Sequence, residues 1–239
     1  MNNVSFPNLD ARLTQAFGLV PNCTVCADVG ADHGLLSLAL LVSGRAKQMI
    51  ISDISEKALN KAKKKITFSG FAKSASFYVC DGLNSLQYKS ADAICILGMG
   101  GQTILHILQN GVSLLKGATL ILGAQTEISN VRAYLYQIGY ELEQEVVVNM
   151  GKHDYFLMRC IPTKKEKIMP YSKKECLLGP LLLQNPTPSF LEWLAKRKQR
   201  LQFMITAMSN AKNDKDDFRL FEAKEELSYI EEELKESVK

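Results

Sequence analysis

The stretch VCADVGADHGLL, residues 25–36, runs from apolar residues into a glycine-containing turn that holds Asp28, Asp32 and His33. A dinucleotide-binding turn has the pattern GxGxxG, in which a helix N-terminus faces a pyrophosphate. Here two carboxylates occupy the turn, and carboxylates repel a pyrophosphate. They suit a ligand that carries a cationic group, and hydroxyl groups that can donate hydrogen bonds. The turn is therefore predicted to bind a ligand of that kind.

Further acidic and glycine residues end later apolar runs, and the carboxyl ends of parallel strands are where ligands bind in open sheets. Asp53 would accept hydrogen bonds from both hydroxyls of a ribose, and Asp81 lies where an adenine amino group could donate. Together with the acidic turn they fit S-adenosylmethionine. An aspartate after a strand is often only a helix cap or a turn residue, but three in succession favour a cofactor site. The residues at these strand ends are Asp28, Gly30, Asp32, His33, Asp53, Asp81, Gly82 and the loop Gly98-Met99-Gly100-Gly101.

The elements that must position these residues follow an alternating pattern. Short runs rich in Val, Ile and Cys alternate with segments of helical period between about residues 25 and 160, which is the pattern of a doubly wound parallel α/β sheet. The runs are CTVCADVG, QMIISDIS, ASFYVCDG, DAICILGM and ATLILGAQ. ELEQEVVVNMGKHDYFLMRCI then predicts two strands joined by a Met-Gly-Lys turn, with an antiparallel strand near the sheet edge.

After Pro162 the pattern changes to a basic connector followed by two helices. Apolar positions recur at 3-4 spacing from Leu194 to Met208 and from Leu220 to Leu234, which predicts an antiparallel helical hairpin that projects as a coiled coil. The alternative is that both helices pack on the sheet domain. We therefore expect a cofactor-binding domain over residues 1–161 and a connector with a helical hairpin over 162–239.

Composition indicates an ordinary globular chain, since 46% of its 239 residues are hydrophobic and 23% are charged. No apolar run is long enough to span a bilayer, and the first residues lack the layout of a signal peptide. We therefore expect a cytoplasmic protein, with no membrane partner, whose six cysteines are reduced. Cys23 and Cys26 have CxxC spacing, but no second Cys/His pair suits a zinc site, so no metal is expected.

The net charge of +4 is distributed unevenly. Residues 1–158 carry 13 basic and 12 acidic side chains, residues 159–212 carry 11 and 3, and residues 213–239 carry 5 and 10. A polyanion would therefore bind the middle segment, unless its charges are merely a solvated surface. The predicted polyanion-binding residues are Lys164, Lys165, Lys196, Arg197, Lys198 and Arg200.

The motifs ADVGADHGLL, SDIS, CDGL and LGMGG resemble those of the bacterial tRNA (adenine-22-N1)-methyltransferases, the TrmK family. LDARL near the N-terminus resembles the family's opening helix, and LGPLLL resembles the segment before its C-terminal hairpin. The resemblance implies a class I, Rossmann-like fold and adds Arg12, Ile54 and Leu83 to the cofactor-binding set. This chain has Gly123-Ala124-Gln125 where the family's Gln-Pro-Asn is expected, so a contact with the target base there is left open.

The resemblance implies methyl transfer from S-adenosylmethionine to N1 of an adenine in the D-arm region of tRNA. Adenine N1 has a free lone pair, so alignment suffices and no covalent nucleophile is needed. Gly98, Gly100 and Gly101, with Met99, would let the backbone approach the methyl donor and the base. Asp32 and His33 could position the base or receive its proton. In the interpretation that we favour, Asp32 instead caps the following helix and binds the cofactor amino group, with His33 packed on it.

Two other functions remain open. The chain could methylate another RNA or a protein, or it could be a non-catalytic tRNA-binding protein that has kept a cofactor fold. A pyrimidine C5-methyltransferase is disfavoured because it needs a thiolate in the catalytic loop, and Cys95 lies three residues before that loop, inside a strand. We expect a monomer, while the sequence leaves the tRNA species and any general base undetermined.

Overall fold

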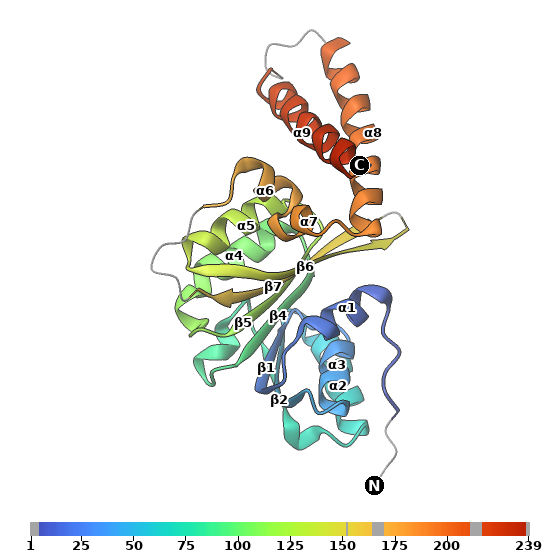
Figure 1. The fold of residues 1–239 in the computed structure, drawn as a ribbon. Coiled ribbons are helices and arrows are strands. Elements are labelled where there is room, and N and C mark those ends of the chain that lie inside the picture. Colours follow the sequence, from blue (N-terminus) through green and yellow to red (C-terminus); the bar gives the residue numbers. More distant parts are fainter. Residues whose placement is uncertain (1–4, 152, 164–169, 211–216, 238–239) are drawn as a thin grey trace. The chain divides into compact units, whose positions relative to one another are not determined.

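The computed structural model describes residues 5–151, 153–163, 170–210 and 217–237, and Figure 1 shows its fold. The chain divides into two compact units, residues 1–169 and residues 170–239. The first unit contains the sheet and the second consists of helices.

A seven-stranded sheet with the order β3-β2-β1-β4-β5-β7-β6 forms the centre of the first unit. The five predicted parallel strands are confirmed; they are β1 (Cys23–Val29), β2 (Ala46–Asp53), β3 (Ala75–Val79), β4 (Ala93–Met99) and β5 (Thr119–Ala124). The predicted hairpin is confirmed as β6 (Tyr140–Met150) and β7 (His153–Pro162). β7 pairs antiparallel with β5, so β6 is the edge strand.

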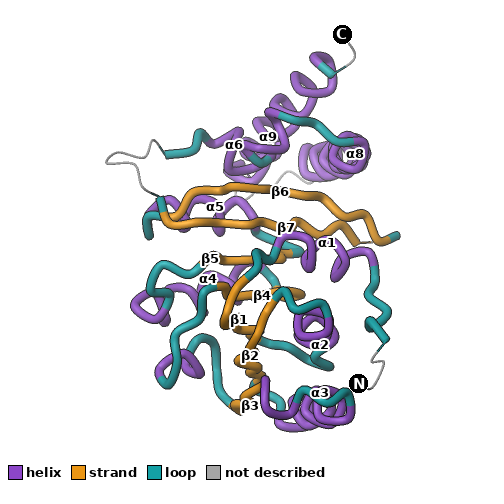
Figure 2. The backbone as a smooth tube through the Cα atoms, turned by 60° about the horizontal axis from the view of Figure 1, so that its bottom comes forward, coloured by secondary structure: helices purple, strands orange, loops and turns teal. Residues whose placement is uncertain are grey.

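Helices cover both faces of this sheet, as Figure 2 shows. One face carries α1 (Ala11–Leu19), α2 (Leu35–Val42) and α3 (Glu56–Phe68), and the other carries α4 (Gly101–Gly111) and α5 (Ile128–Gln137). Short 3-10 turns are η1 (Ala72–Ser74), η2 (Asn84–Gln87) and η3 (Val112–Leu114). Because both faces are covered, central strand residues such as Ile51, Ile94 and Ile121 are fully buried.

The second unit contains α6 (Lys173–Leu178), α7 (Pro180–Gln184), α8 (Pro188–Asn210) and α9 (Asp217–Glu236). α8 and α9 pack as an antiparallel pair (Figure 1). Leu194 and Leu201 of α8 and Ala223 and Ile230 of α9 are buried, as their 3-4 spacing predicts. The helical hairpin is thus confirmed, and its coiled-coil supercoiling stays a prediction.

Candidate functional site

Two cavities open at the carboxyl edge of the parallel strands. The Arg12 cavity, of about 500 Å³, is lined by residues from α1 and from the ends of β1, β4, β5 and β7. The Asp53 cavity, of about 270 Å³, is lined by residues after β1, β2, β3 and β4. Gly30, Leu97 and Gly98 line both cavities, so the two meet between the ends of β1 and β4.

Asp28 is the buried carboxyl group of the Arg12 cavity, and only 5% of its surface is exposed. Burial raises the pKa of Asp28 to about 6, while the Ser37 hydroxyl, which donates to its Oδ2 at 2.5 Å, acts in the opposite direction. The nearby Asp53 carboxylate also raises this pKa. A cationic group in the cavity would replace the solvation that Asp28 lacks, so this carboxyl group is suited to bind an ammonium.

The turn after β1 takes a left-handed backbone at Gly30, Asp32 and Gly34. The expected capping role of Asp32 is wrong, because Gly34 is the N-cap residue of α2 and no side chain caps that helix, all of which the structure describes. Asp32 and His33 instead lie exposed on the wall of the Arg12 cavity, with His33 Nδ1 3.6 Å from Asp32 Oδ1. Both side chains are therefore accessible to a bound ligand.

Asp53 ends β2 on the wall of the Asp53 cavity, as predicted. Its Oδ2 accepts from the backbone N–H of Asp32 at 3.0 Å, and its Oδ1 accepts from that of Ser55 at 2.8 Å. Each carboxylate oxygen retains one further acceptor site, so the pair of hydroxyls on a ribose can still bind. Ile54, Asp81 and Gly82 line the same cavity.

Leu83 does not line the Asp53 cavity. It is buried with 3% of its surface exposed, and it borders a separate cavity of about 270 Å³ with Asp81 and Gly82. A Cβ atom at Gly111 would lie 2.8 Å from the Cβ atom of Leu83, which shows that Leu83 packs against α4. Leu83 thus has a packing role, and its contact with the cofactor stays a prediction.

The Gly98-Met99-Gly100-Gly101 loop divides into two parts with different roles. Gly98 lies at a register shift between β4 and β5, has φ +75°, and lines both cavities, while Met99 lines the Asp53 cavity. Gly100 and Gly101 instead pack against the loop after β5: a Cβ at Gly100 would lie 3.1 Å from Thr126 Oγ1, and one at Gly101 2.4 Å from the Thr126 carbonyl oxygen. That Gly100 and Gly101 also let the backbone approach donor and base stays a prediction.

Arg12 and Tyr155 form the wall of the Arg12 cavity that is contributed by α1 and β7. The Arg12 guanidinium lies 5.3 Å from the centre of the Tyr155 ring, and its Nη2 is 3.8 Å from Asp10 Oδ2. Gln125, just after β5, also lines this cavity. A cationic and an aromatic side chain thus line the same cavity as the acidic turn.

Known proteins match this arrangement over most of the chain. A family model described as a methyltransferase domain matches residues 9–158. The chain belongs to this methyltransferase family. A tRNA (adenine(22)-N(1))-methyltransferase of Bacillus subtilis (strain 168) is 29% identical over 208 residues, 85% of this chain and 87% of that protein.

Solved structures resemble the methyltransferase over nearly its whole length. The crystal structure of the B. subtilis m1A22 tRNA methyltransferase TrmK matches with a TM-score of 0.86 at 27% identity and covers 95% of this chain and 99% of that chain. M. capricolum TrmK in complex with S-adenosyl-homocysteine matches with a TM-score of 0.82 at 24% identity, over 95% and 98%. At 24% identity, the second match supports the fold alone.

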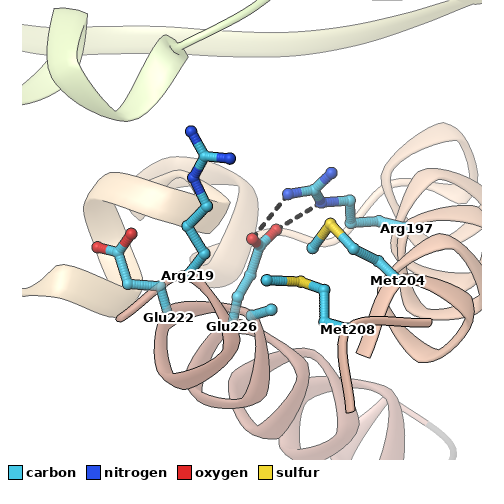
Figure 3. Close-up of a pocket in the computed structure, with 7 residues that line it drawn as sticks. Arg197, Met204, Met208, Arg219, Glu222 and Glu226 are labelled. Atoms are coloured by element: carbon cyan, nitrogen blue, oxygen red, sulfur yellow. Dashed lines mark hydrogen bonds and ion pairs between the residues drawn. The ribbon is translucent and has the colours of Figure 1, made fainter. Parts of the chain in front are cut away.

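The basic residues of α8 in this methyltransferase are mostly paired with carboxylates. Arg197 donates from Nε and Nη2 to both carboxylate oxygens of Glu226, at 2.6 and 2.7 Å (Figure 3). Lys198 Nζ lies 3.1 Å from Glu231, and Lys196 Nζ lies 2.6 Å from Glu192 of its own helix. Basic residues of α8 and acidic residues of α9, which lie in separate segments of the sequence, therefore form ion pairs in the structure.

Four of the six predicted polyanion-binding residues lie on α8. Lys196, Arg197 and Lys198 form ion pairs, whereas Arg200 is exposed and forms none with the described residues. Lys164 and Lys165 lie outside the described residues. In the α6 segment, Lys173 pairs with Glu225 and Lys174 with Glu232, at 2.6 and 3.0 Å. A charge count by segment overstates the cationic surface of the second unit.

Sequence reasoning missed Tyr155, Asp10 and Leu97, which line the Arg12 cavity. Asp10 had a local signal, since it caps α1 by accepting from the backbone N–H of Leu13 at 2.7 Å. Tyr155 had none, because its position depends on the pairing of β7 with β5. Over the described residues, no cluster could hold a metal ion and no helix is long and apolar enough to cross a membrane.

Proposed function

We propose that this protein transfers a methyl group from S-adenosylmethionine to N1 of adenine 22 in tRNA. The observation that carries the proposal is that two cavities share Gly98, one lined by Arg12, Asp28 and Tyr155 and the other by Asp53 and Asp81. Relatives whose names state this reaction support adenine as the target base and 22 as its position in the tRNA.

The residues present fit S-adenosylmethionine. Asp53 would hold the ribose hydroxyls, Asp28 the ammonium group and Asp81 the adenine amino group, while Ile54, Gly82 and Met99 line the cavity around them. Arg12 suits the cofactor's carboxylate. Gly30, which lines both cavities, has φ +70°, a backbone conformation that favours glycine. When bound, the cofactor supplies an electrophilic methyl group on a sulfonium.

The chain's own contribution to catalysis is positioning. Gly98 exposes backbone where the cavities meet, so an adenine can approach closely with its amino group near a carbonyl acceptor. Asp32 and His33 are exposed titratable groups on the wall of the Arg12 cavity that could accept the proton that the methylated base sheds. Because N1 is on the base-pairing edge, the adenine must first leave its pairing or tertiary contacts.

The tRNA is proposed to dock partly on residues 162–239, and the protein is proposed to act as a monomer in the cytoplasm, where tRNA is processed. Arg200 is an exposed cation of α8, whereas Lys196, Arg197 and Lys198 are each paired with a glutamate and would have to exchange it for a phosphate. Lys164 and Lys165 stay in the proposal as sequence-based expectations.

Mapping the modified nucleotide tests the proposal. Unmodified tRNA transcripts are incubated with the protein and labelled cofactor, and the methylated position is read by primer extension and nucleoside analysis. We expect N1-methyladenosine at position 22, and no label in a matched transcript that carries guanine there. Label in ribosomal RNA or protein instead would support the alternative substrates, and cofactor binding without any transfer would support a non-catalytic tRNA-binding protein.

A further inference from the structure

The outer face of α3 carries a line of lysines that the charge count of the first unit hides. Lys57, Lys61 and Lys64 are spaced i, i+4 and i+7, and Phe68 continues the line at i+11, so the four side chains share one helix face. All three lysines are exposed, and 94% of the Phe68 surface is exposed. Along the helix axis the line spans roughly 16 Å, from a rise of about 1.5 Å per residue.

Among the described residues these lysines have no carboxylate partner, unlike the paired cations Lys173, Lys174, Lys196, Arg197 and Lys198 of the second unit. Glu56, in the first turn of α3, is the acidic neighbour, and with Asn60 it borders the same shallow depression of about 520 Å³ as the three lysines. The positive charge of this face is therefore available to an external anion.

The packing of α3 holds this face rigidly beside the proposed active site. Leu59, Ala62 and Ile66 are buried on the opposite side of the helix. Ser55 caps the helix by accepting from the backbone N–H of Ala58 at 3.3 Å, and Ser55 itself donates its backbone N–H to Asp53. α3 thus starts at the wall of the Asp53 cavity, on the flank of the sheet shown in Figure 2.

We propose that the outer face of α3 is a docking surface for the RNA backbone on the catalytic unit, separate from the helical hairpin. Lys57, Lys61 and Lys64 would contact successive phosphates, and Phe68 would stack on an unpaired base at the far end. The proposal rests on the proposed function, because it takes RNA to be the substrate. An anionic membrane fits the face less well, since the apolar side of α3 is already buried and one exposed aromatic residue is too little to insert.

The test compares two triple variants of the full-length protein that lose the same charge. Lys57→Ala, Lys61→Ala and Lys64→Ala together remove the line. Lys47→Ala, Lys73→Ala and Lys89→Ala together remove exposed lysines at the amino-terminal edge of the sheet, where Lys47 is the second residue of β2 and Lys73 and Lys89 precede β3 and β4. Binding of an unmodified tRNA transcript is titrated at several salt concentrations, and S-adenosylmethionine binding and the thermal midpoint are measured alongside.

We expect the α3 variant to bind tRNA at least tenfold more weakly, and the slope of log affinity against log salt to flatten by about 2 to 3, at roughly 0.7 to 0.9 per lost phosphate contact. Its cofactor affinity and thermal midpoint should match the wild type, and the control triple variant should keep wild-type tRNA binding. Phe68→Ala alone should weaken tRNA binding without changing the salt slope, because stacking releases no counterions.

Equal losses in both triple variants would overturn the proposal, since they would reflect overall charge. Wild-type tRNA affinity and slope in the α3 variant would overturn it too. So would loss of binding to vesicles containing phosphatidylserine while tRNA binding is kept. These outcomes are separable from failure of the proposed function, which would appear as a wild-type protein that methylates no tRNA transcript.

Discussion

The carboxylate of Asp53 accepts a hydrogen bond from the backbone N–H of Asp32, with an Oδ2–N distance of 3.0 Å. This bond joins the end of β2 to the acidic turn after β1. Asp53, the residue proposed to bind the ribose, therefore also holds the backbone of the turn that lines the Arg12 cavity. This hydrogen bond therefore connects the walls of the two cavities.

Asp53→Ala should weaken S-adenosylmethionine binding by at least tenfold, because it removes two hydrogen bonds to a charged acceptor, each of about 1.5 to 3 kcal/mol. Asp92→Ala is a matched control: Asp92 Oδ2 accepts from the backbone N–H groups of Thr24 and Val25, both at 2.9 Å, at the start of β1. Calorimetry should show a loss of affinity for the Asp53 variant alone. Equal cofactor affinity in the two variants would remove Asp53 from the site.

Cofactor binding should depend on pH through Asp28. Because the pKa of Asp28 is about 6, raised mainly by burial, an ammonium-binding carboxylate is lost as the pH falls through 6. We expect the affinity for S-adenosylmethionine to drop between pH 7 and 5. Asp28→Asn should bind weakly with little pH dependence, and Ser37→Ala should move the midpoint upward because it removes the hydrogen bond that favours the charged form.

The raised pKa of Asp28 makes cofactor binding stronger at higher pH, but it makes the cofactor-free protein less stable at higher pH. The folded pKa lies above the ordinary value of 3.8, so the folded state binds more protons between pH 4 and 6 and this group's contribution to stability is lost as the pH rises through that window. The size is about 2 to 3 kcal/mol, at 1.36 kcal/mol per pKa unit. Asp28→Asn should therefore be more stable than wild type at pH 7 without cofactor, and equal stability would contradict the burial of a charged Asp28.

Gly101→Ala should destabilise the first unit by roughly 1 to 3 kcal/mol, because its Cβ would lie 2.4 Å from the Thr126 carbonyl oxygen. Gly18→Ala in α1 is the matched control, because a Cβ at Gly18 would have no atom within 4 Å. This substitution should stabilise the helix by about 0.5 to 1 kcal/mol. Denaturant unfolding measures both. Gly100→Val should also lose stability against Thr126, so its turnover alone does not report on the active site.

The features that the sequence predicts well are local ones. The parallel strands and the position of Asp53 follow from apolar runs and the residues that end them, and α3 follows from its helical period. Tyr155 could not be found this way, because its place in the Arg12 cavity depends on the register between β7 and β5. The roles of Leu83 and Gly101 depend on close packing between elements distant in sequence.

The charge pattern also depends on contacts between elements that are distant in the sequence. A count along the chain places an excess of cations in residues 159–212 and an excess of anions after residue 213. Antiparallel pairing of α8 with α9 brings Lys198 beside Glu231, so the two excesses offset each other. The lysines of α3, in a segment of nearly balanced count, are exposed and have no carboxylate partner among the described residues.

Arg197 and Arg200 should respond oppositely to replacement, although they lie three residues apart on α8. Arg197→Ala leaves Glu226, whose side chain is 13% exposed, without its two charge-assisted hydrogen bonds, so the thermal midpoint of the hairpin should fall by several degrees. Arg200→Ala removes an exposed cation, so it should leave the midpoint unchanged while it weakens tRNA binding and lowers the salt slope by about 1. Calorimetric melting and tRNA titrations over a salt series measure both effects. If Arg197→Ala instead lowers the salt slope and spares the midpoint, its guanidinium exchanges Glu226 for phosphate on binding, and the hairpin is an RNA-binding element through its paired residues as well.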